Sequence, residues 1–123
     1  MSNYFTASDI IKYLPTIEKY TDYQSGDTYF DNYISKAIKS IKLILKKRNI
    51  EITDNDLKLN ENLRELVLSK IVYEVYLENS YRVEEDRYLI DKLEIIYKDL
   101  LKDYIEINSS GVVYLDVSSN FQG

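Results

Sequence analysis

LRELVLSKIVYEVYL, residues 63–77, is apolar on nearly every side when it is wound as a helix. An ordinary surface helix carries one apolar stripe and one wide polar face, and this segment has no such polar face. We therefore predict a helix over residues 61–79. It is either central to the fold or sandwiched between its own core and a neighbouring subunit.

The segments on either side of this helix carry a single apolar stripe each. Before it, residues 27–47 predict a helix that is capped by Asp27 or Thr28 and that stops at a left-handed Asn49. After it, residues 84–105 predict a helix with the acidic residues 84–86 in its first turn. These assignments rest on apolar residues that recur every three or four positions, namely Phe30, Ile34, Ile38, Ile41 and Leu45 in the first segment and Leu89, Leu93, Ile96, Leu100 and Tyr104 in the second.

The N-terminal region predicts one short helix and two connections. Thr6 is a suitable cap for a helix with Asp9 in its first turn, and Pro15 ends that helix. Residues 16–26 have no sustained period and predict an irregular or partly helical connection. Residues 50–60 are the longest gap between helices, and their early alternation predicts a short extended segment.

The C-terminal tail has a different pattern. Residues 109–111, Ser-Ser-Gly, break the helical period, and residues 112–117 have the β-branched content of a strand. Such a strand either pairs with residues 50–52 or forms an arm that completes its hydrogen bonds on another chain. The fold class is therefore mainly α, a small bundle of about four helices with a short C-terminal strand or arm. We divide the chain into a helical domain, 1–110, and this strand or arm, 111–123.

The composition disfavours catalysis. The chain has no Cys and no His, which removes thiol nucleophiles, the usual zinc ligands and the side chain that titrates near neutrality. Asp54 with Asp56, and the acidic residues 84–86, lack the spacing and the glycine of a calcium loop. No phosphate-binding or nucleophile-elbow motif is present either. We predict that the protein is not an enzyme and binds neither cofactor nor metal.

The charge pattern bears on the partners. The net charge of −5 disfavours general binding to nucleic acid, which requires an excess of Lys and Arg. The basic series Lys36, Lys39, Lys42, Lys46, Lys47 and Arg48 is read as a solvated helix face, with nucleic-acid contact as the alternative. No stretch approaches the ~20 apolar residues that cross a bilayer, so we predict no membrane partner and synthesis in the cytoplasm.

The order of the predicted elements carries a resemblance. FTASDIIKYLP gives a short capped helix, YFDNYISKAIKSIKLILKKR an amphipathic helix, LRELVLSKIVYEVYLE an apolar helix and DRYLIDKLEIIYKDLLKDY a second amphipathic helix. With a loop of about ten residues before the apolar helix and a small tail, this pattern resembles the head–tail connector, or adaptor, proteins of tailed bacteriophages.

The resemblance implies a structural role in the virion, made in a bacterial host. A member forms a ring of about twelve copies with heterologous contacts, docks on the portal protein and presents a platform for another neck or tail protein. DNA would meet the ring only by passing through it. The hypothesis places the subunit contacts in the loop and the tail, at Ile50, Ile52, Leu57, Leu59, Val113, Tyr114, Leu115 and Phe121.

A second class of function fits the same sequence. A stand-alone helical regulatory or chaperone-like protein would bind one partner, with the basic helix at residues 36–48 touching nucleic acid. The two classes differ in mass, because a connector forms rings, whereas a regulator stays a monomer or a dimer.

Overall fold

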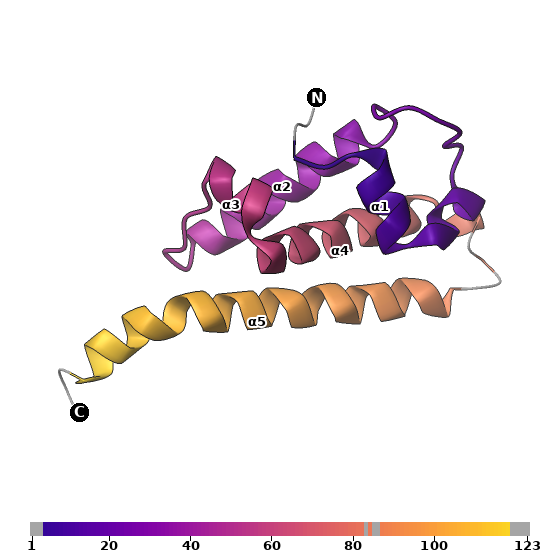
Figure 1. The fold of residues 1–123 in the computed structure, drawn as a ribbon. Coiled ribbons are helices and arrows are strands. Elements are labelled where there is room, and N and C mark those ends of the chain that lie inside the picture. Colours follow the sequence, from indigo (N-terminus) through magenta and orange to yellow (C-terminus); the bar gives the residue numbers. More distant parts are fainter. Residues whose placement is uncertain (1–3, 83, 85–86, 119–123) are drawn as a thin grey trace.

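The computed structural model describes the backbone of residues 4–82, 84 and 87–118, and the side chains as far as residue 109. The fold is mainly helical, as predicted, and the described backbone contains no strand. Helix α4 lies between α5 and the other helices (Figure 1). The elements in chain order are α1 (Ala7–Tyr13), the 3-10 helix η1 (Pro15–Tyr20), α2 (Asp31–Lys46), α3 (Asp54–Leu59), α4 (Glu61–Glu78), the 3-10 helix η2 (Ser80–Arg82) and α5 (Tyr88–Ser118).

Helix α1 begins and ends as the sequence predicts. The Thr6 hydroxyl accepts a hydrogen bond from the Asp9 backbone N–H, and the Asp9 carboxylate accepts one from the Thr6 N–H. This reciprocal arrangement satisfies two backbone donors at the helix start. Pro15 then opens η1, whose Ile17 and Tyr20 side chains are buried, so part of the predicted connection is helical.

Helix α2 begins later than predicted. Its N-cap is Phe30 rather than Asp27 or Thr28, and no side chain caps it. Burial explains the difference, because the Phe30 ring lies in the core and fixes where the helix can start. The end of the helix is confirmed: α2 finishes at Lys46 and Asn49 has a left-handed φ of 60°.

Helix α3 was not predicted. Thr53 and Asp56 form the same reciprocal cap as Thr6 and Asp9, with N···O distances of 3.0 and 3.1 Å. The extended interpretation of residues 50–60 is therefore wrong from Asp54 to Leu59, where the chain is helical. Residues 50–52 form neither a helix nor a strand. The Thr-x-x-Asp signal at residues 53–56 was present in the sequence and marked this helix start.

Helix α4 is central to the fold. It contacts α1, η1, α2, α3 and α5, and this environment matches a segment that is apolar on all sides. A neighbouring subunit is therefore not needed to cover it. Its buried residues are Leu63, Leu66, Val67, Ser69, Ile71, Val72, Val75 and Tyr76.

Helix α5 corrects two predictions. It begins at Tyr88 rather than at residue 84, and Glu84 precedes it. It then continues through residues 109–111 to Ser118, so the predicted strand at 112–117 is wrong and the boundary between residues 110 and 111 lies inside one helix. Helical hydrogen bonds are made within the segment, whereas a strand needs a partner, and the described part of the chain supplies none.

Candidate functional site

The predicted contact residues of the loop divide into buried and exposed ones. Ile50 is 8% exposed and Leu57 is 1% exposed, and both belong to the main core cluster. Their assignment to an interface is wrong, because a side chain enclosed by its own chain cannot contact a partner. Ile52 is half-buried against the core, while Leu59 is 75% exposed. Of these four loop residues, only Leu59 is exposed enough to contact a partner freely.

The predicted contact residues of the tail lie on or beyond α5. Val113, Tyr114 and Leu115 belong to this helix rather than to a strand. Phe121 lies outside the described residues. The structure therefore does not gather the tail and the loop into one sheet edge.

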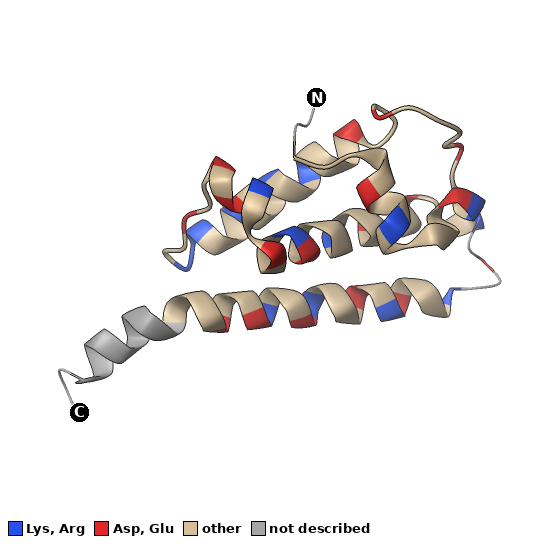
Figure 2. Cartoon of the chain, viewed as in Figure 1, with Lys and Arg blue, Asp and Glu red and all other residues tan. Residues whose placement is uncertain are grey.

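Basic charge gathers on α2. Its acidic residue, Asp31, is in the first turn, and every later charge on the helix is positive (Figure 2). Residues 36–48 hold six of the 16 basic residues and none of the 21 acidic residues. The remainder of the chain has ten basic and 21 acidic residues, a formal net charge of −11. The overall net charge of −5 is therefore the sum of a basic segment, residues 36–48, and a strongly acidic remainder.

A groove lies along α5 beside Arg48, a residue that follows the end of α2. Its volume is about 300 Å³, and Leu101 and Ile105 supply its apolar lining. The charged residues around it are Arg48, Lys98, Lys102 and Glu106, which leaves an excess of two positive charges. Lys98 pairs with Glu94 of its own helix at 3.1 Å. Among the residues with described side chains, neither Arg48 nor Lys102 has an ion-pair partner within 4.0 Å.

Sequence reasoning missed this groove. Leu101 and Ile105 lie one turn apart, beside the predicted stripe of α5, and they are only half-buried. Arg48 was assigned to the basic face of α2 alone. Their proximity depends on how α2 and α5 are placed around α4, which the local sequence pattern does not specify.

Acidic residues precede and follow the exposed Leu59 along the chain. Glu51, Asp54, Glu61 and Glu65 are all exposed, and they flank or belong to α3 and the first turns of α4. Lys58 is the exposed basic residue in this segment. Residues 51–65 have five acidic and two basic residues, so this part of the chain has a formal net charge of −3.

Arg64 holds α3 in place. Its Nη1 donates hydrogen bonds of 2.7 Å to the backbone carbonyls of Tyr4 and Leu57. Its Nη2 lies 3.5 Å from the Asp9 carboxylate, and its guanidinium stacks over the Phe5 ring at 4.4 Å. The Arg64 side chain thus links the N-terminal segment, α3 and α4. It fixes the position of α3, the helix that ends at Leu59.

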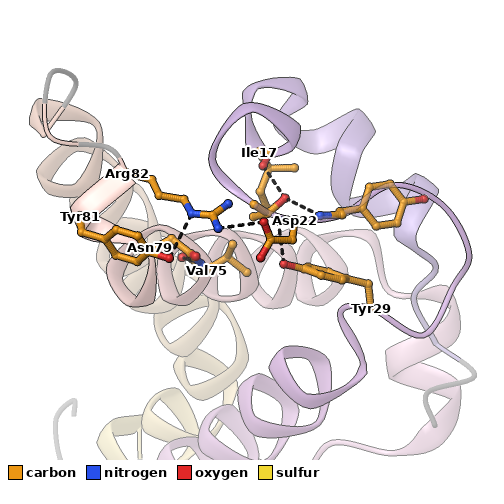
Figure 3. Close-up of polar contacts among 9 residues, drawn as sticks. Ile17, Asp22, Tyr29, Val75, Asn79, Tyr81 and Arg82 are labelled. Carbon is orange, nitrogen blue, oxygen red and sulfur yellow. Dashed lines mark hydrogen bonds and ion pairs between the residues drawn. The ribbon is translucent and has the colours of Figure 1, made fainter.

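A polar cluster links the connection before α2 to η2, the short helix that follows α4 (Figure 3). Arg82 Nη2 lies 2.8 Å from the Asp22 carboxylate, and its Nε donates to the Tyr81 hydroxyl at 3.1 Å. The Asp22 backbone N–H donates to the Tyr29 hydroxyl at 3.1 Å. These groups satisfy one another's hydrogen-bonding capacity near the surface. We therefore assign the cluster a structural role.

The α4–α5 interface contains tyrosines with altered acidity. Burial, followed by the nearby Glu74 carboxylate, raises the pKa of Tyr97. Burial, followed by Glu94, likewise raises the pKa of Tyr73, whose hydroxyl lies 3.4 Å from Glu94. Both phenols therefore stay protonated near neutral pH. The two rings stack with centroids 6.3 Å apart.

The described residues contain no group of three or more carboxylates placed to hold a metal ion. None of the described helices has the length and apolar character needed to span a bilayer. Comparison with protein-family models, with curated proteins and with solved structures finds no match to this chain.

Proposed function

We propose that this protein is a structural, non-enzymatic subunit of a tailed-bacteriophage neck, a head–tail connector that forms a ring on the portal protein. The ring would link the portal to another neck or tail protein and would be part of the virion. Support comes from the helix order quoted above and from the form of α5.

The length of α5 is the observation that carries the proposal. Helix α4 has 18 residues and α5 has 31, so α5 is about 20 Å longer than the helix it packs against. The C-terminal part of α5 continues past the N-terminal end of α4 (Figure 1). Residues 111–118, GVVYLDVS, are mostly apolar, and an apolar helical extension favours burial against another protein surface.

The enclosed α4 changes how a ring would be built. Because α4 is covered by its own fold, it offers little surface to a neighbour. The contacts between copies would therefore come from the α5 extension and from exposed apolar residues such as Leu59. These lie on different elements, as a heterologous ring contact requires.

A second candidate is a stand-alone regulatory or chaperone-like binding protein. Two observations favour it: a closed core that needs no neighbour, and the basic residues 36–48, which suit contact with nucleic acid. Such a protein would function as a monomer or dimer. The exposed apolar residues would then serve one partner.

Mass in solution separates the two candidates. We expect light scattering at high protein concentration to give a large multiple of the 14.6 kDa chain mass, because ring contacts close into one defined assembly. A mass that stays at one or two chains throughout the concentration range would contradict the connector proposal and support the regulator.

A further inference from the structure

The acidic surface around Leu59 and the basic groove at the end of α2 have matching chemistry. Each combines an apolar centre with charge of one sign. Leu59 is the exposed apolar group of the first, and the exposed residues Glu51, Asp54, Glu61 and Glu65 precede and follow it in the chain. Leu101 and Ile105 line the second, with Arg48, Lys98 and Lys102 around them. Protein interfaces commonly place an apolar core inside a polar rim in this way.

We propose that Leu59 of one copy, with the carboxylates before and after it in the chain, docks into the groove between Arg48 and α5 of the next copy. The inference rests on the proposed function, for which it supplies one contact between subunits. Burial of Leu59 would remove apolar surface from water, and the carboxylates would approach Arg48 and Lys102. Both cations lack an ion-pair partner among the described side chains.

The charge distribution favours a second copy of this chain over nucleic acid as the occupant. Residues 51–65, which include Leu59, have five acidic and two basic residues, and their formal net charge of −3 is complementary to the basic groove of another copy. The apolar lining of the groove also fits a leucine side chain better than a phosphate backbone.

The contact joins two different patches, the knob formed by Leu59 and the groove, so it can repeat head to tail or be made twice, reciprocally, in a two-fold dimer. Repeating such a contact generates a ring when the rotation closes. Two knobs of equal charge repel one another, and so do two grooves. The arrangement therefore disfavours assemblies that place knob on knob or groove on groove.

Charge reversal on each side tests the contact. One variant carries Arg48→Glu with Lys102→Glu in the groove, and the other carries Glu61→Lys with Glu65→Lys beside the knob. All four residues are exposed, so the fold should survive, and circular dichroism checks this. We expect each variant alone to stay at the mass of one chain in light scattering. An equimolar mixture should recover assembly, because each variant then meets a complementary surface on the other.

Truncating the knob gives a second measurement. Leu59→Ser should weaken self-association at least about tenfold, which corresponds to the ~1.4 kcal/mol of a modest apolar contact. The matched control is Leu43→Ser on the outer face of α2, where the leucine is 59% exposed and the association should not change.

The outcomes separate this contact from the proposed function. If the parent chain forms rings and the reversed variants do so equally well, the knob-and-groove contact is wrong while the connector role stands. If the parent chain stays a monomer, the connector role and the contact both fail. If it forms only a dimer, the connector role fails, and the contact fails as well when the charge-reversed variants form the same dimer. Duplex DNA binding by the parent that is lost in Arg48→Glu with Lys102→Glu, without a change in mass, would assign the groove to nucleic acid and overturn the inference.

Discussion

At the scale of single residues, short reciprocal caps encode the starts of α1 and α3. Thr6 with Asp9 and Thr53 with Asp56 make the same pair of hydrogen bonds at two places in the chain. The first pair was read from the sequence as a cap. The second was not, because the Asp and Asn residues around it also favour turns.

The caps predict a measurable loss of stability. We expect Thr53→Ala to lower the free energy of unfolding by about 1 kcal/mol, because the Asp56 backbone N–H loses its acceptor. Urea denaturation followed by circular dichroism measures this value. The control is Thr28→Ala, an exposed threonine in the connection before α2, which should change stability by less than about 0.5 kcal/mol. Equal losses for both variants would contradict the capping role.

Arg64 should matter more than any other surface cation. Replacement by Leu leaves the Tyr4 and Leu57 carbonyls without their donor, so we expect a loss of about 2 kcal/mol in the free energy of unfolding. Arg87→Leu, at an exposed position before α5, is the matched control and should have little effect. A loss in the control as large as in Arg64→Leu would show that the hydrogen bonds are not the cause.

At the scale of helices, long periodic segments were predictable and short or terminal ones were not. The existence of α2, α4 and most of α5 followed from apolar residues spaced for a helix. The end of α5 did not, because Val112, Val113 and Val117 are common in strands. The helix prevails there since its hydrogen bonds are internal. The groove could not be predicted, because it depends on packing between distant segments.

The α4–α5 interface predicts a loss of stability at high pH. The folded protein holds the Tyr97 proton more tightly than the unfolded chain does, because burial and Glu74 raise the pKa of this phenol. The stabilisation is complete below the unfolded pKa of about 10 and is lost as the pH rises above it. Tyr73 and Tyr104 have pKa values shifted in the same direction, so their contributions add to the decline.

A single substitution tests this pH dependence. We expect the melting temperature of Tyr97→Phe to fall less steeply than that of the parent between about pH 9 and pH 11.5. Tyr88→Phe, which alters an exposed ring at the start of α5, should follow the parent curve. Identical slopes for Tyr97→Phe and the parent would contradict the link between this buried phenol and stability.

At the scale of the whole molecule, the chain combines a closed core with unequal surfaces. The core encloses α4, so the folded unit does not depend on a neighbour for its centre. Its apolar and charged features outside the core include Leu59, the basic groove and the α5 extension. We interpret this combination as a stably folded subunit whose surface features serve contacts with other subunits.

Electron microscopy with the portal protein encoded in the same genome tests the connector role most directly. We expect the full chain to add a ring of density on the portal, and we expect deletion of residues 111–123 to abolish that ring while the helical signal per residue stays nearly unchanged. A portal that remains bare with the full chain, or a ring that forms equally well with the truncated chain, would contradict the account.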